Sequence, residues 1–224
     1  MSKPVIKKEQ VKTLCDAKYI RLYDLQYAEG KHYFDATRRE ADRIVAVKTD
    51  EEFQTMLPDA VTIAVILHLP EEEPKLLLNY EYRYPVGQFL LSPVAGLLDP
   101  EDAAEEDPLR AAAAREIFEE TGIRMQESDR ITVLNPCAFS SPGMTDESNA
   151  FLAADVYLPD LSSLSQTNAV GTEVFNGTEL VTKDEAKEIY ENGRDRFGNT
   201  FSLATWAVLG YFCSRDEEND ILQE

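Results

Sequence analysis

Apolar and polar residues alternate along the first part of the chain, as they do in half-buried β-strands. Over residues 19–47 this alternation surrounds the turn sequence Ala-Glu-Gly-Lys at residues 28–31, which predicts a β-hairpin or meander. A polar, acidic segment over residues 48–59 follows and contains Pro58. Because such segments separate folded regions, we predict a β-rich N-terminal module over residues 1–57 and a main domain over residues 58–224.

The main domain mixes strand and helix patterns. Continuous apolar runs predict strands over residues 60–69 and 75–84, joined by an exposed Pro-Glu-Glu-Glu-Pro turn. The best delimited helix has Asp107 as its N-cap, Pro108 as its first residue and Gly122 as its left-handed stop. This order of elements predicts an α/β layered domain. The pattern also predicts strands from residue 88 to Gly96, over 131–134 and over 149–158, and helices over 180–193 and 202–213.

The composition indicates a folded, soluble protein with a strong negative charge. Hydrophobic residues make up 43% of the 224 residues, and 42 Asp and Glu stand against 22 Lys and Arg, which gives a formal charge of −20. This charge repels nucleic acids and anionic membranes at long range, so we expect neither as a partner. A small phosphate ester could still bind if a divalent metal ion stood between the two negative partners.

Cysteines and apolar segments bear on the cellular compartment. The N-terminus contains lysines but no apolar run long enough for a signal peptide, and no later run has the length that spans a bilayer. Cys15, Cys137 and Cys213 are far apart and lack Cys-x-x-Cys spacing, so free thiols in a reducing environment are expected. We therefore expect a cytoplasmic protein.

Three carboxylates lie close together in the sequence of the predicted helix that begins at Pro108. Glu116, Glu119 and Glu120 are separated by spacings that place them on one helical face, beside an apolar stripe that includes Ile117. Like charges at this spacing repel, and a hard divalent cation such as Mg²⁺ or Mn²⁺ would relieve the repulsion. A charged helix face is more often merely solvated, so this spacing alone does not establish a metal site.

The surrounding sequence strengthens the metal interpretation. The segment Arg115–Ile123 resembles the second half of the Nudix box, in which Arg-Glu is followed by an apolar residue, any residue, Glu-Glu, any residue, Gly and an apolar residue. Gly96, at the end of a predicted strand, matches the first glycine of the box. The distance from this glycine to Arg115 exceeds that of the box by five residues. The middle glutamate of the box is replaced by Asp102 or by Asp107, depending on the end from which one counts.

Three further motifs resemble the ADP-ribose and ADP-sugar pyrophosphatase branch of the Nudix hydrolases. They are Glu-Tyr-Arg-Tyr-Pro at residues 81–85, Ala-Gly-Leu-Leu-Asp at 95–99 and Ser-Pro-Gly-Met-Thr-Asp-Glu at 141–147. The resemblance implies a Nudix fold, which is an α/β/α sandwich with a mixed sheet, and a homodimer formed through the N-terminal module. It also implies metal-dependent cleavage of a nucleoside diphosphate sugar, with ADP-ribose giving AMP and ribose 5-phosphate.

One departure from this branch concerns the substrate. The branch has Glu-Leu-Pro before its Ala-Gly, where this chain has Ser92-Pro93-Val94. Either the ligand pocket differs or ADP-ribose is not the preferred substrate. Another nucleotide sugar or nucleotide is one alternative, and a Nudix-like binding or regulatory domain without turnover is another. The intact carboxylates argue against a domain without turnover, because such a domain would not need them.

The resemblance also assigns roles to residues of this sequence. It implies metal ligation by Glu116, Glu119, Glu120 and the Ala95 carbonyl, with Glu116 and Glu119 also counted as catalytic. It implies that Glu147 is the general base, that Arg83 and Arg38 bind substrate, and that Arg115, Gly96 and Gly122 give structural support.

Simpler roles stay open for several of these residues. Glu147 could be an ordinary surface acid on its loop, and Arg83 could form a salt bridge with Glu81. The aromatic residues of the predicted hairpin could stack an adenine, but alternating aromatics more often belong to a core or a dimer interface. These residues are Tyr27, Tyr33 and Phe34.

Overall fold

The computed structural model describes residues 3–168 and 173–215 of the chain. The chain forms two compact units, the first over residues 1–59 and 137–149 and the second over residues 60–136 and 150–224. Segment 137–149 was not expected in the first unit, because a local sequence pattern carries no information about distant spatial partners. The proposed domain boundary between residues 57 and 58 stays a prediction.

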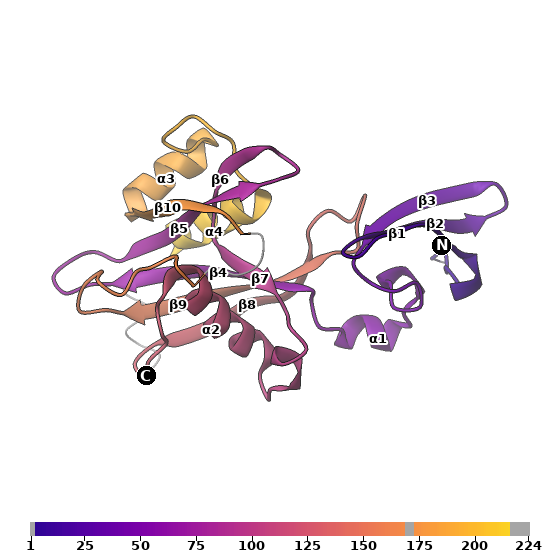
Figure 1. Cartoon of the computed structure of the whole chain (residues 1–224), viewed down its shortest axis with the longest axis horizontal. Helices are drawn as coiled ribbons and strands as arrows, with labels where there is room; N and C mark the ends of the chain where they lie inside the picture. Colours follow the sequence, from indigo (N-terminus) through magenta and orange to yellow (C-terminus); the bar gives the residue numbers. More distant parts are fainter. Residues whose placement is uncertain (1–2, 169–172, 216–224) are drawn as a thin grey trace. The chain divides into compact units, whose positions relative to one another are not determined.

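The described part of the first unit contains a three-stranded antiparallel sheet in the order β1-β2-β3 (Figure 1). The predicted hairpin is confirmed as β2 and β3, in which Ala28 pairs with Lys31 and Gly30 takes a φ of 62° that other residues rarely adopt. Tyr23, Leu25 and Ile44 form the buried core of the unit. The elements are η1 (Lys8–Gln10), β1 (Val11–Asp16), β2 (Arg21–Ala28), β3 (Lys31–Thr37), η2 (Val45–Val47) and α1 (Asp50–Thr55).

The described part of the second unit is built around a seven-stranded sheet (Figure 1). Its strands are β4 (Ala60–His68), β5 (Lys75–Arg83), β6 (Gln88–Ser92), β7 (Val94–Leu97), β8 (Arg130–Phe139), β9 (Ser148–Tyr157) and β10 (Phe175–Val181). The main path runs β10-β5-β4-β9-β8, with β6 paired antiparallel to β5 and β7 paired antiparallel to β4. β4 and β9 run in the same direction, because the Asp59 N–H donates to the Ser148 carbonyl where both strands begin and the Leu158 N–H donates to the His68 carbonyl where both end. The sheet is therefore mixed.

Helices cover both faces of this sheet (Figure 1). On one face, alternate residues of β4 such as Ile63 form a buried cluster with Ile117 of α2. On the other face, Ile66 belongs to a second buried cluster with Val208 of α4. Burial on both faces explains the continuous apolar run of β4. The α/β/α arrangement confirms the fold class implied by the resemblance. The helices are α2 (Pro108–Thr121), which follows the short η3 (Asp102–Ala104), α3 (Lys183–Asn192) and α4 (Leu203–Ser214).

Three predicted elements were wrong in their extent. The strand expected over residues 131–134 is longer, because β8 runs over Arg130–Phe139. The single strand expected from residue 88 to Gly96 is two strands, because β6 pairs with β5 and β7 pairs with β4 on either side of Pro93. Proline has no N–H and cannot continue a ladder of hydrogen bonds. The helix expected from Leu180 starts later, because Leu180 pairs with β5 as part of β10 and the side chain of Thr182 then caps α3.

The three cysteines take part in no disulfide within the described residues, as expected. Cys15 is exposed, whereas Cys137 and Cys213 are half-buried. Burial raises the pKa of the Cys213 thiol. In the described ranges, none of the helices has both the length and the apolar character needed to cross a bilayer.

Candidate functional site

Helix α2 holds the carboxylates in a defined orientation. As predicted, the Asp107 side chain accepts a hydrogen bond from the Arg110 N–H at the start of α2, and Gly122 ends the helix with a φ of 77°. Glu116 and Glu120 lie next to the face that packs on the sheet and are only 4% and 2% exposed. Glu119 is less buried. The three carboxylates therefore share one side of the helix but not one environment.

Glu120 is bound by two neighbouring strands. The Ala95 N–H of β7 donates to its Oε1 at 3.1 Å, and the Asn79 side-chain amide of β5 donates to its Oε2 at 2.6 Å. Burial, together with the charges of Glu81 and Glu116, raises the pKa of Glu120 well above its usual value despite these donors. Ala95 thus contacts the carboxylate through its N–H, while metal ligation by its carbonyl stays a prediction.

Glu116 fills space that exists only because residue 96 is glycine. A Cβ built on Gly96 would lie 1.9 Å from Glu116 Oε1, inside the carboxylate itself. Burial raises the pKa of Glu116 to about 7, although the neighbouring Arg115 acts in the opposite direction. The glycine of the box therefore allows a buried carboxylate to lie directly against β7.

Arg115 connects this helix to the loop that precedes it. Its Nη1 lies 2.7 Å from Glu116 Oε1 and 3.1 Å from Glu119 Oε2. Its Nη2 lies 2.7 Å from Asp102 Oδ2 and donates to the Leu97 carbonyl at 2.8 Å. These are the carboxylate contacts that a supporting role requires.

The same contacts distinguish the two aspartates that could replace the middle glutamate of the box. Asp102 is 6% exposed. Burial alone would raise its pKa, but the bonds and charge of Arg115, together with the Asp99 N–H, hold the pKa of Asp102 below its usual value. Asp107 instead caps α2 and pairs with Arg110 at its surface. Asp102 is therefore the acid that the extended loop brings to the box arginine.

The donor set fits a hard divalent cation. Within residues 3–168 and 173–215, no three His, Cys, Asp or Glu side chains already converge in a metal-binding cluster. The Arg115 guanidinium pairs with Glu116 and Glu119 but not with Glu120. Glu116 and Glu120 are nearly buried oxygen donors, and burial raises the pKa of both because it disfavours their charged forms. Mg²⁺ or Mn²⁺ prefers oxygen ligands and would compensate these charges.

Two residues of β5 that surround Glu120 were not identified as site residues from the sequence. Asn79 bonds Glu120, and Glu81 follows two positions later, so the two side chains emerge on the same face of the strand. Burial raises the pKa of Glu81, and its charge acts on Glu120. The period-two polar pattern of the predicted strand was the available signal. Arg83 lies 2.6 Å from Glu81, so the salt bridge left open above is present, and contact with substrate stays a prediction.

Glu147 and Arg38 belong to the first unit, whereas the α2 carboxylates belong to the second. Arg38 forms an ion pair with Glu147, and both side chains are partly exposed. Tyr33 donates a hydrogen bond to the Gly143 carbonyl of the Ser-Pro-Gly loop. Of the hairpin aromatics, Tyr23 belongs to the core of this unit, whereas Tyr27, Tyr33 and Phe34 are exposed.

Known proteins share extensive sequence with this chain, although no family model matches it. A Schizosaccharomyces pombe protein named as an uncharacterised Nudix hydrolase is 33% identical over 163 residues, which are 70% of this chain and 74% of the relative. The chain belongs to the Nudix hydrolase family. A second relative, a Caenorhabditis elegans protein named "Putative nudix hydrolase 2", is 35% identical over 81 residues, which are 36% of this chain and 33% of that protein. Membership identifies the protein as a pyrophosphohydrolase of Nudix type, an enzyme class that uses divalent metal ions and nucleotide-derived substrates.

Proposed function

We propose that this Nudix hydrolase cleaves the diphosphate of a nucleoside diphosphate sugar with the help of Mg²⁺ or Mn²⁺. ADP-ribose is the leading substrate, with AMP and ribose 5-phosphate as products. The observation that carries the proposal is the pair of nearly buried carboxylates, Glu116 and Glu120, on a helix that matches the Nudix box. Like charges buried one helical turn apart favour a bound cation.

The proposed reaction needs a base and phosphate-binding groups besides the metal. The oxygen of a water molecule bonds to one phosphorus, the bond from that phosphorus to the bridging oxygen breaks, and a proton of the water passes to a base. A bound divalent ion supplies charge neutralisation at the phosphate oxygens. We assign the base to Glu147. We assign metal binding to Glu116, Glu119, Glu120 and the Ala95 carbonyl, and phosphate binding to Arg38 and Arg83.

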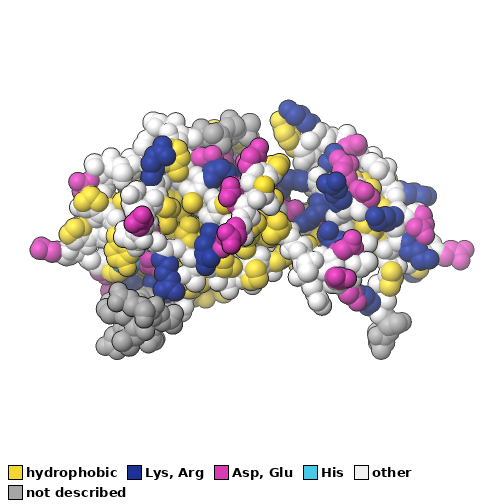
Figure 2. Space-filling view, turned by 90° about the horizontal axis from the view of Figure 1, so that it is seen from below, with side chains coloured by type: hydrophobic (Ala, Val, Ile, Leu, Met, Phe, Trp, Pro, Cys, Tyr) yellow, Lys and Arg dark blue, Asp and Glu magenta, His cyan; other side chains and the backbone are white. Residues whose placement is uncertain are grey.

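The distribution of charge supports these assignments. The first unit carries 11 Lys and Arg against 13 Asp and Glu, whereas the second carries 11 against 29. On the face seen in Figure 2, Lys and Arg side chains gather over the first unit. The acidic second unit repels an anionic substrate, so a divalent ion held by its carboxylates would supply the attraction there.

We further propose that the β-rich module over residues 1–57 forms a homodimer. Large apolar side chains of this module are more than half exposed, including Leu14, Ile20 and Phe34. Light scattering at micromolar concentration should return about twice the chain mass of 25.3 kDa, and a mass near 25.3 kDa would contradict the dimer. The three free thiols fit a reducing compartment, and we place the protein in the cytoplasm.

A substrate panel tests the enzymatic proposal. Purified protein is incubated with ADP-ribose and other nucleotide sugars, with Mg²⁺ or with a chelator, and the products are measured as phosphate released by an added phosphatase. We expect metal-dependent release that Glu120→Gln lowers on the order of 100-fold. Glu188→Gln is the matched control, because Glu188 is an exposed glutamate on α3. Absence of release from every nucleotide sugar would refute the proposed substrate class.

A further inference from the structure

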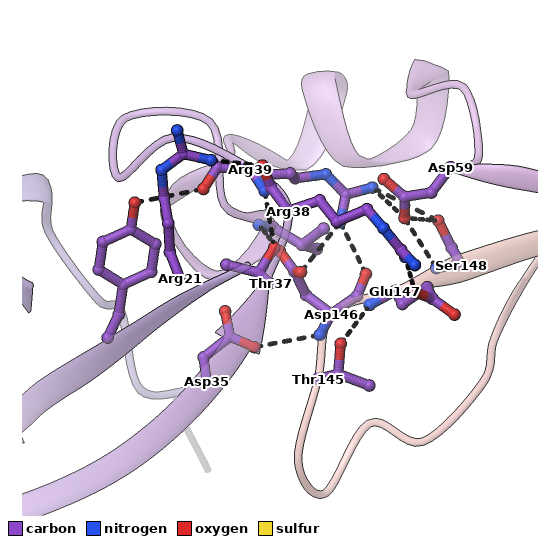
Figure 3. A network of polar contacts seen from close by, with 12 residues as sticks. Arg21, Asp35, Thr37, Arg38, Arg39, Asp59, Thr145, Asp146, Glu147 and Ser148 are labelled. Carbon is purple, nitrogen blue, oxygen red and sulfur yellow. Dashed lines mark hydrogen bonds and ion pairs between the residues drawn. The ribbon is translucent and has the colours of Figure 1, made fainter. Parts of the chain in front are cut away.

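The loop over residues 141–147 is hydrogen-bonded to strand β3 of the N-terminal hairpin, and Figure 3 shows its bond with Asp35. The Ala36 N–H of β3 donates to the Met144 carbonyl at 3.0 Å, and the Tyr33 hydroxyl donates to the Gly143 carbonyl at 3.0 Å. The Asp146 N–H donates to Asp35 Oδ1 at 3.1 Å. A loop with this sequence could move as a lid, but its backbone is bonded to β3 at Gly143, Met144 and Asp146.

Arg39 holds the chain on both sides of Glu147 through its carboxylate partners. Its Nη2 lies 2.7 Å from Asp59 Oδ2, and its Nη1 lies 3.1 Å from Asp146 Oδ1 and donates to the Asp146 carbonyl at 2.7 Å. Asp59 Oδ2 in turn accepts hydrogen bonds from the Ser148 N–H at 2.8 Å and the Ser148 hydroxyl at 3.0 Å. The residues on both sides of Glu147 are therefore held by one network centred on Arg39.

The turn that carries Arg39 is itself fixed. The Thr37 hydroxyl accepts a hydrogen bond from the Arg39 N–H at 3.0 Å, and the Tyr23 hydroxyl donates to the Arg39 carbonyl at 3.2 Å. Arg21 donates to the Arg38 carbonyl at 2.9 Å. Anchored in this way, the consecutive arginines take different environments. Arg39 is 13% exposed inside the network, whereas Arg38 is half exposed and pairs with Glu147.

Charge explains why an arginine is needed at this position. Asp35 is buried and the Asp146 side chain is only 10% exposed; within the described residues Asp35 Oδ2 has no hydrogen-bond partner, and Asp146 Oδ1 has only its ion pair with Arg39. Burial and the charge of Asp146 raise the pKa of Asp35 to about 6. The planar guanidinium of Arg39 reaches two carboxylates and a carbonyl at once, which the single ammonium of a lysine cannot do with the same geometry.

We propose that Arg39 is a positioning residue for hydrolysis, acting through the loop that carries Glu147. This inference rests on the proposed function, in which Glu147 is the general base. Arg39 contacts neither substrate nor the reacting atoms in this role. It fixes the backbone on both sides of Glu147 through Asp59 and Asp146, so that the base keeps one orientation.

Kinetics of four proteins test the inference, namely wild type, Arg39→Met, Arg39→Lys and the matched control Arg43→Met, in which an exposed arginine nearby is removed. With ADP-ribose and Mg²⁺, we expect Arg39→Met to lower kcat about 100-fold, because a displacement of about 1 Å can cost that much, while KM changes little. Arg39→Lys should retain an intermediate kcat, and Arg43→Met should match wild type.

A double variant separates positioning from general loss of structure. If Arg39 acts through Glu147, then Arg39→Met in a Glu147→Gln background should lower kcat by less than about threefold further. A full additional 100-fold loss would overturn the inference, and so would an unchanged kcat in both Arg39 variants. If Arg39→Met does not fold, the same comparison with Arg39→Lys decides the matter.

Amide hydrogen exchange gives a readout that needs no activity. Exchange of the segment 143–148 should accelerate at least about tenfold in Arg39→Met and Arg39→Lys relative to wild type and Arg43→Met. Unchanged exchange would overturn the inference. An inactive wild type would instead contradict the proposed function, and the exchange data would still show whether Arg39 holds the loop.

Discussion

Replacing Gly96 by alanine directly tests the close approach of helix α2 to strand β7. The added Cβ would lie 1.9 Å from Glu116 Oε1. The carboxylate would have to retreat by more than about 1 Å to reach van der Waals distance. Gly96 does not adopt a left-handed φ, so the backbone itself accepts alanine and the effect is purely steric.

Glu116 cannot retreat freely. It is 4% exposed, and Arg115 holds its carboxylate at 2.7 Å. We therefore expect an overpacking cost of about 1–3 kcal/mol in the free energy of unfolding. Urea denaturation followed by the fluorescence of Trp206 measures this cost, because Trp206 is the single tryptophan of the chain and lies in the same unit as Gly96.

A double-mutant cycle isolates the cause. In a Glu116→Ala background the obstacle is absent, and Gly96→Ala should be neutral or stabilising by up to about 1 kcal/mol, since alanine is favoured over glycine inside a strand. The coupling energy between the two sites should then be about 1–3 kcal/mol. Equal costs of Gly96→Ala in both backgrounds would refute the steric reasoning, as would a stable Gly96→Ala single variant.

Three further predictions follow from buried charges. Asp102→Asn should lower the free energy of unfolding by about 3 kcal/mol, because it breaks the ion pair with Arg115. Asp107→Asn should be nearly neutral, because asparagine is an equally good N-cap. Equal effects of the two variants in urea denaturation would argue against Asp102 as the partner of the box arginine. The pKa of Asp35 is raised from 3.8 to about 6, so its contribution to stability is fully present below pH 3.8 and is lost as the pH rises through 6. Asp35→Asn should therefore raise the free energy of unfolding at pH 8 by up to about 3 kcal/mol. It should also make the free energy of unfolding less dependent on pH between pH 4 and 6. A variant less stable than wild type at pH 8 would contradict this. Mg²⁺ at 100 times its Kd should stabilise the wild type by about 2.7 kcal/mol and so raise its melting temperature. The melting temperature of Glu120→Gln should not rise. An equal rise in both proteins would exclude Glu120 as a ligand.

Most of the fold follows from local sequence pattern. The hairpin of β2 and β3, the strands β4 and β5 and helix α2 with its caps were all predicted, because periodicity, turn residues and capping act over a few neighbouring residues. The errors occurred where strand pairing decides the outcome. Pro93 divides one apolar run between two partner strands, and β10 takes up Leu180 because it pairs with β5.

The candidate site, like the fold, could be predicted from the sequence only in part. The spacing of Glu116, Glu119 and Glu120, and hence the Nudix resemblance, was available from the sequence alone. Their environments were not, because burial raises the pKa of both Glu116 and Glu120, and the charge of Glu81 on β5, which is distant in sequence, raises that of Glu120 further. The choice between Asp102 and Asp107 was likewise open until Arg115 was seen to contact Asp102.

The neighbouring arginines Arg38 and Arg39 show most clearly which contacts a local sequence pattern does not predict. The alternating pattern before Arg38 and Arg39 predicts a strand there, and resemblance drew attention to Arg38. The ion pairs of Arg39 with Asp59 and Asp146 became apparent only in the folded chain, because folding brings these distant aspartates to it. Local pattern specifies which residues a helix or strand presents, whereas burial and ion pairing depend on which distant segments meet it.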